Sequence, residues 1–376
     1  MRAGFSEDSV DWRGTSRHQG ALKIGPYRAG FGRALPAEDL VTVGISCESC
    51  HFGGREHAVE GKEIRFVPTA LELAIHRPGS DELVASDRDD PLVVNSICAQ
   101  CHNADLNRYP NSAPSVNSEE ATALTSGACS SRIKCTDCHD PHEAGAPSGS
   151  ADRPSYIEAC LSCHPHFEDP AARSRHAQHS DQVTCLDCHM PRIVAGLDTV
   201  ARSHFISSPG EAAMVKTGSP NACNLCHLDR SISWTLGELE ERWDLEVLDR
   251  RQLGKWFGPD RDAPLGTVWL RSPDRFTRLA ATEAYARSPF IDEPIPFMLE
   301  SLKDEYALNR TFGLIAIERV LTDPGGGVRP AGRARSARRA GGEARRVLAR
   351  AHPAHAFSWR ARGHATRLVA YRVPGP

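Results

Sequence analysis

The sequence predicts a mainly α-helical chain whose first part has little regular structure and whose second part is a short helical repeat. In the first part, a short cysteine motif recurs between residues 47 and 227. The stretches from the second motif onward are rich in Pro, Ser, Asn and Asp, which favour turns. Amphipathic segments separated by Pro then run from Arg271 to Leu321. Aromatic residues make up only 6% of the chain, which is little for a core of side chains alone. The domains expected are 1–230, 231–322 and 323–376.

The recurring motif is Cys-x-x-Cys-His, and it takes up twelve of the 13 cysteines, leaving Cys129 over. The spacing matches the attachment of c-type haem, because each thiol adds to one vinyl group of the porphyrin and the next residue, His, reaches the iron. The sequence therefore predicts six covalently bound haem c groups, which would also serve as the apolar core. In chain order, the first to sixth motifs are Cys47, Cys50 and His51; Cys98, Cys101 and His102; Cys135, Cys138 and His139; Cys160, Cys163 and His164; Cys185, Cys188 and His189; and Cys223, Cys226 and His227.

Three other uses of paired cysteines compete with haem as an explanation of the motifs. Zinc knuckles do not require a His after every second Cys. Redox dithiols come singly, near a strand–helix–strand pattern. Disulfides within such short, regular pairs would be a poor framework for a long chain. A His after all six pairs favours haem over each of them.

Each iron has a second axial position, and residues 1–228 hold eight histidines outside the motifs. Methionine is scarce there, so bis-histidine ligation is the default, with potentials below those of His/Met cytochromes. The segment RHAQH places two histidines at a spacing that predicts a shared helical face. We expect His76 and His166 to be bystanders. The candidate distal ligands are His18, His57, His142, His176, His179 and His204.

Three segments, GISCESCHFGGREHAVEG, CTDCHDPHEAG and CLDCHMPRIVAGLDTVARSHFISSP, resemble the bacterial multihaem c-type cytochromes. That family includes the tetrahaem cytochromes of ammonia oxidisers and the pentahaem nitrite reductases. The resemblance implies closely packed haem pairs, distal histidines supplied from elsewhere in the chain, and export from the cytoplasm. The catalytic haem of the nitrite reductases has Lys in place of the proximal His. All six motifs here end in His, which argues against that activity.

The beginning of the chain, MRAGFSEDSV, lacks the apolar region of an export signal. The segment VDWRGTSRH resembles a W-x-x-S-x-H pattern that follows a haem motif in the family, yet no motif precedes it here. We therefore expect the start to be truncated or misassigned and the protein to be periplasmic or otherwise extracytoplasmic. The chain has no run of 18 or more apolar residues, so no transmembrane helix is predicted.

Residues 231–257 predict one or two helices, and those from Arg271 to Leu321 a repeat of the HEAT kind. The repeat is either a docking surface for a protein partner or a plain helical cap on the haem domain. From Arg329 to Pro376 the chain has 12 Arg and one acid, Glu343. A disordered basic tail or a frameshift would give this composition, and the frameshift is slightly favoured.

The favoured function is electron transfer through six haems between other redox proteins. The acidic body that precedes the basic tail argues against nucleic acid as a partner. The alternative is an oxidoreductase that acts on a small nitrogen or sulfur compound at one five-coordinate haem. A structural adaptor acting through the helical repeat fits only as an accessory role.

Overall fold

The computed structural model describes residues 47–51, 54–65, 80–82, 89–103, 107–130, 132–142, 154–180, 182–196, 199–210, 217–246, 250–288 and 295–322. His18, His76 and the tail 323–376 lie outside these residues. The described chain is mainly helical, as the sequence predicts, with one two-stranded sheet. Among these residues, no helix combines the length and the apolar character needed to span a membrane.

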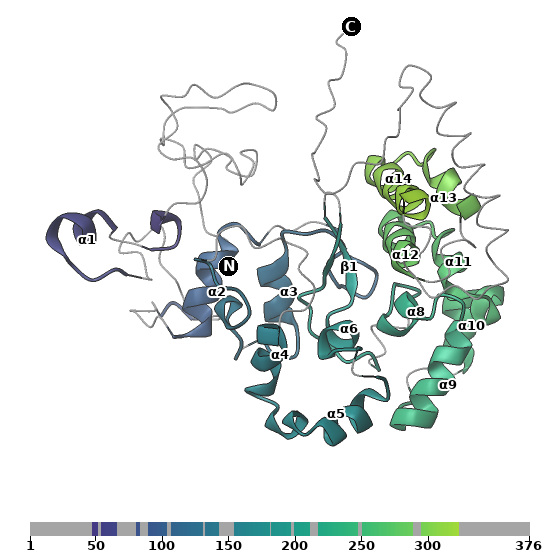
Figure 1. The fold of residues 1–376 in the computed structure, drawn as a ribbon, viewed down its shortest axis with the longest axis horizontal. Coiled ribbons are helices and arrows are strands. Elements are labelled where there is room, and N and C mark those ends of the chain that lie inside the picture. The colour runs from purple at the N-terminus through teal and green to yellow at the C-terminus, as the bar shows by residue number, and fades with distance from the viewer. Residues whose placement is uncertain are drawn as a thin grey trace, which may run out of the picture.

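The helices fall into two groups along the chain (Figure 1). The first group is α1 (Gly54–Glu60), α2 (Pro91–Ala99), α3 (Glu120–Ser126), α4 (Pro154–Leu161), α5 (Pro170–Ala177), α6 (Cys185–His189) and α8 (Ala222–Cys226), with 3-10 turns at Cys47–Ser49, Cys135–Asp137 and Pro165–Glu168. The second group is α9 (Ile232–Trp243), α10 (Arg250–Phe257), α11 (Leu265–Trp269), α12 (Arg275–Arg287), α13 (Ile295–Ser301) and α14 (Ala307–Thr322), with a 3-10 turn at Gly258–Asp262.

Two helices that carry functional candidates begin at an Asp-Pro pair. Asp90 accepts a hydrogen bond from the N–H of Leu92 at the start of α2. Asp169 does the same for Ala171 at the start of α5. An aspartate cap satisfies a free backbone N–H and complements the helix dipole, and proline is well tolerated in the first turn. These pairs fix where the two short helices start.

The motifs themselves form single helical turns. In five of them the N–H of the histidine donates to the carbonyl of the first cysteine, at 2.8–3.0 Å, and in the fifth motif the whole stretch is α6. One helical turn brings residues i, i+3 and i+4 to one side, so two thiols and an imidazole share a face. The aspartates in CTDC and CLDC, Asp137 and Asp187, each accept the N–H that opens their turn, from Lys134 and Thr184.

A conventional core of side chains lies beside the later motifs. Strands β1 (Arg192–Ala195) and β2 (Val200–Arg202) pair antiparallel, and α12 packs on β1. One buried cluster extends from these strands through α8 and α9 to α14, with Trp269 and Tyr285 almost fully buried. The core thus runs across residue 230, and the domain division at that residue stays a prediction.

Tyr109 joins the strands to the second group of helices. Its ring is 3% exposed, and its hydroxyl donates to the carbonyl of Ile193 at 2.7 Å and lies 3.3 Å from that of Phe276. Burial, with a smaller contribution from the charge of Asp274, raises the pKa of Tyr109 well above its ordinary value. The phenol is therefore a neutral donor that links segments far apart in the sequence.

The second group confirms two helices within residues 231–257, α9 and α10, and three more within 275–322. Helix α14 packs on both α12 and α13. Whether these helices form a repeat of the HEAT kind stays a prediction.

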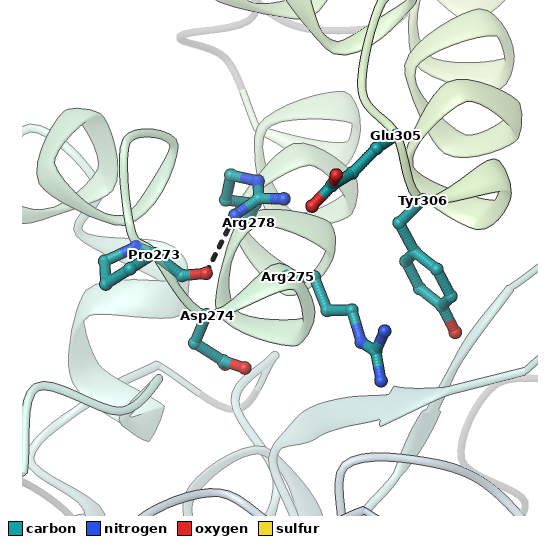
Figure 2. A pocket seen from close by; sticks show the side chains of 6 residues that line it. All are labelled: Pro273, Asp274, Arg275, Arg278, Glu305 and Tyr306. Carbon is teal, nitrogen blue, oxygen red and sulfur yellow. Dashed lines mark hydrogen bonds between the residues drawn. The ribbon is translucent and has the colours of Figure 1, made fainter.

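An open hollow lies where α12 and α14 begin (Figure 2). The guanidinium of Arg275 lies 4.6 Å from the ring centre of Tyr306, and Arg278 pairs with Asp304 at 2.8 Å. The lining includes no residue of a Cys-x-x-Cys-His motif. Its residues are Pro273, Asp274, Arg275, Arg278, Glu305 and Tyr306.

Replacement of Tyr109 by Phe should lower the free energy of unfolding by about 1–2 kcal/mol, because a buried carbonyl loses its donor while the ring stays in place. The denaturant midpoint measures this. Tyr306→Phe is the matched control, since the half-buried Tyr306 borders the open hollow, and it should change stability by less than about 0.5 kcal/mol. Equal effects of the two variants would contradict the role given to Tyr109.

Candidate haem sites

The thirteen cysteines all lie in described residues, and all are free thiols. Their side chains are exposed or half-buried rather than enclosed in the protein core. Within the part of the chain that the structure describes, no three side chains of His, Cys, Asp or Glu converge as a set of metal ligands. Within the described residues, the structure shows no disulfide and no tetrahedral set of metal ligands at the motifs.

Four motif histidines each face a histidine from outside the motifs. Two pairs have nearly parallel rings: His51 and His142, with centroids 6.1 Å apart, and His176 and His189, with centroids 6.0 Å apart. The other two pairs are tilted. They are His139 with His204, at 6.1 Å, and His179 with His227, at 6.3 Å.

This spacing is what an iron between two imidazoles requires. An imidazole nitrogen binds a metal at about 2.0 Å and lies roughly 1.1 Å from its ring centre, so two imidazoles on opposite sides of one metal have centroids about 6.2 Å apart. Offset ring stacking covers a wider range of separations. Four values within 6.0–6.3 Å, each joining one motif histidine to one other, fit axial ligation of haem iron.

The two histidines of RHAQH lie near different motifs and His179 lies beyond the end of the helix, so the predicted shared helical face was wrong. Helix α5 ends at Ala177, and Gln178 adopts a left-handed conformation with φ 54°. The chain turns there, which sends His176 to the fifth motif and His179 to the sixth. The indole N–H of Trp243, at the end of α9, donates to the carbonyl of His176 at 2.7 Å and holds this turn in place.

A close backbone contact positions the segment that carries His204. A β-carbon on Gly127 would lie 2.8 Å from the backbone nitrogen of Ile206, so only glycine allows the approach. Ala128 then donates its N–H to the carbonyl of Ile206 at 3.0 Å. One residue further, the carbonyl of Ser207 accepts the Nδ1–H of His189 at 2.9 Å. The segment thus presents one histidine to the third motif and supports the proximal histidine of the fifth.

Burial also favours the neutral form of several facing histidines. It lowers the pKa of His204, of His176 and of His227, and the charges of neighbouring histidines add to each effect. Neutral imidazole is the form that binds a metal. In His179 the Nδ1–H donates to the carbonyl of Ala177 at 2.6 Å, which leaves Nε2 for the side facing the sixth motif.

Among the described residues, neither the candidate His57 nor the predicted bystander His166 is placed to ligate the iron of a motif from the opposite side. His57 lies in α1, and its Nδ1–H donates to the carbonyl of Lys62 at 2.7 Å, which leaves Nε2 free for a ligand. His166 lies 6.3 Å from His164 but only two residues along the chain. Two residues span at most about 7 Å, too little to pass round the edge of a porphyrin to its opposite face. His166 instead packs on Phe167 at 3.8 Å.

The thiols of consecutive motifs are neighbours in space. A hydrogen bond with Cys98 raises the pKa of Cys135, and one with Cys185 raises the pKa of Cys160; the charge of Cys138 adds to the second rise. These contacts join the second motif to the third and the fourth to both the third and the fifth.

The two ends of the series are joined in the same way. Burial raises the pKa of Cys50, and the charges of both thiols of the second motif raise it further. Burial likewise raises the pKa of Cys188 to about 12, to which the thiols of the sixth motif contribute. Every two consecutive motifs are therefore near enough for their thiols to influence each other.

Two protein-family models match parts of the chain that contain these motifs. The family model Cytochrome c552 matches residues 152–244, which hold the last three motifs. The model Doubled CXXCH motif matches residues 127–169, which hold the third and fourth. No curated protein and no solved structure matches the chain at a significant level. The chain is a multihaem c-type cytochrome. The cytochrome binds haem c covalently through its Cys-x-x-Cys-His motifs, and its function is electron transfer.

Sequence reasoning missed several polar residues that position the motifs of the cytochrome. Asn95 in α2 donates to the carbonyl of Ile133 and accepts the N–H of Cys135, which ties the second motif to the third. Asn224, inside the sixth motif, accepts the hydroxyl of Thr235 and so ties that motif to α9. Both asparagines are buried, and a buried amide in or beside a haem motif is the signal that would have pointed to them.

Loss of a single distal histidine should change one iron only. His204→Ala should turn the iron of the third motif from low-spin to high-spin, about one sixth of the total, because its sixth ligand is lost. Optical and electron paramagnetic resonance spectra measure this. His166→Ala is the matched control and should leave the spectra unchanged. A high-spin signal in the control with none in His204→Ala would reverse the two assignments.

The turn at Gln178 makes the effects of the two RHAQH histidines independent. His176→Ala and His179→Ala should each create one high-spin iron, and the double variant should create two, about one third of the total. Difference spectra of the three variants measure the count. A double variant that matches either single variant would mean that both histidines serve one iron.

Proposed function

We propose that this cytochrome carries electrons through six haems arranged in the order of their motifs. The observation that carries the proposal is that the thiols of every two consecutive motifs influence each other electrostatically, with hydrogen bonds between the second and third motifs and between the fourth and fifth. Groups anchored to neighbouring thiols lie close together, and short separations allow stepwise electron transfer. The haem supplies the one-electron couple, and the protein sets its axial ligands, its burial and its distance from the next.

The facing histidines support the same function. The first, third, fifth and sixth motifs would each have two imidazole ligands, drawn from His142, His204, His176 and His179. Two strong ligands fill the iron and leave no position for a substrate, as suits a carrier. The second and fourth motifs would take their ligands from His18 and His57, the two candidate histidines that remain.

The proposal includes an extracytoplasmic location, in the periplasm or beyond, and redox proteins as donor and acceptor. The helical region would be the docking surface for one of them. Its open hollow exposes the guanidinium of Arg275, which would attract an acidic partner (Figure 2).

One observation favours the alternative, an oxidoreductase for a small nitrogen or sulfur compound. Among the described residues, the second and fourth motifs have no histidine from another segment across from His102 or His164. An iron left with five ligands at either motif would have an open face for a substrate. The two functions therefore differ in the ligation of these two irons.

Spectroscopy of the wild-type cytochrome separates the two functions. Produced in a host that exports and matures c-type cytochromes, the protein should carry the added mass of six haems. All its irons should be low-spin, and nitrite, hydroxylamine and cyanide should not alter the spectra, because a carrier has no open coordination position.

Two results would contradict the carrier. A high-spin fraction of about one sixth that shifts on adding nitrite or hydroxylamine would establish the oxidoreductase instead. A colourless protein without the added mass would contradict both functions.

A further inference from the structure

Glu120, the first residue of α3, lies against the proximal histidine of the second motif. Its Oε2 is 3.0 Å from Nδ1 of His102, and its Oε1 accepts the N–H of Ser118 at 2.8 Å. An imidazole that binds iron through Nε2 carries its hydrogen on Nδ1, so His102 donates and the carboxylate accepts. The glutamate side chain is 27% exposed, so solvent screens this contact only in part.

Further contacts hold the start of α3 on this motif. The N–H of Ala121 donates to the carbonyl of His102 at 2.9 Å, and the hydroxyl of Thr122 donates to the side chain of Asn103. Ser118, whose N–H orients the carboxylate, has φ 85°, a conformation that costs energy for a residue with a side chain. Three successive residues of α3 thus contact two successive residues at the second motif.

The acceptor of this hydrogen bond differs from those of His189 and His179. The Nδ1–H of His189 donates to the backbone carbonyl of Ser207, and that of His179 to the carbonyl of Ala177. Those acceptors are neutral, whereas Glu120 carries a full negative charge. An anionic acceptor draws the proton further from the ring, makes the imidazole a stronger electron donor and stabilises ferric over ferrous iron.

We propose that Glu120 lowers the reduction potential of the haem at the second motif through its hydrogen bond to the proximal His102. This inference rests on the proposed binding of a haem at that motif. The second position in the row is then harder to reduce than it would be with a neutral acceptor. An electron that reaches the haem of the second motif would pass on readily to the haem of the first or the third motif. Both of these motifs have thiols near those of the second.

Potentiometric titration of the mature, six-haem protein tests the proposal. Glu120→Gln keeps the shape and removes the charge. It should raise one of the six potentials by at least 59 mV, which is a tenfold change in the ratio of reduced to oxidised iron for one electron. The resonance signal of one iron should change with it, because the donor strength of its ligand has changed.

Two further variants separate the hydrogen bond from a general effect of charge or folding. Glu300→Gln removes the same charge from an exposed site in α13 and should leave all six potentials in place. Glu120→Asp keeps the charge on a shorter side chain, so its potential should lie between those of the wild type and Glu120→Gln.

Mass spectrometry distinguishes the two ways in which this can fail. A wild-type protein with no haem at the second motif would contradict the proposed function. Glu120→Gln with six haems, an unchanged unfolding midpoint and six unchanged potentials would overturn the role of Glu120 alone. If Glu120→Gln does not fold, Glu120→Asp with wild-type potentials would overturn it equally.

Discussion

The separation of about 6 Å between facing imidazoles is the geometric constraint on which the first part of this molecule depends. It matches the value of about 6.2 Å expected for two imidazoles on opposite sides of one metal ion. With iron in place, each pair becomes a cross-link between segments that the sequence separates, such as His51 with His142. A chain of short helices and turns needs such links, because its own aromatic content is low. Folding and haem attachment are therefore coupled in this region.

The second part is stabilised in a different way. From β1 to α14 the protein has a continuous core of buried side chains, joined to the rest through Tyr109. Helix α9 connects the two parts: Trp234 packs on the ring of His227 at 4.8 Å, and Trp243 holds the carbonyl of His176. The last two candidate haem sites thus lie beside a core of buried side chains, whereas the earlier ones lie among short helices and turns.

The sequence predicts well those features of the haem motifs that covalent chemistry fixes over a few residues. The spacing of Cys185, Cys188 and His189 follows from the porphyrin, and one helical turn is enough to build it. The distal ligands are harder to predict, because they depend on which segments, far apart in the sequence, lie together in the fold. His142 lies three residues after the third motif yet faces the first, and a single left-handed residue, Gln178, separates the histidines of RHAQH. Glu120 was missed because its partner His102 is reached only after the chain has folded back.

The pairing of motifs along the sequence differs from their closest pairing in space. The doubled-motif family model spans the third and fourth motifs, whereas the thiol hydrogen bonds join the second to the third and the fourth to the fifth. The third and fourth motifs therefore belong to one pair by sequence and to different pairs by contact. The boundary between the two contact pairs is thus bridged by the sequence pair. In the proposed row of haems, this arrangement would let electrons cross from one contact pair to the next, which isolated haem pairs would not allow.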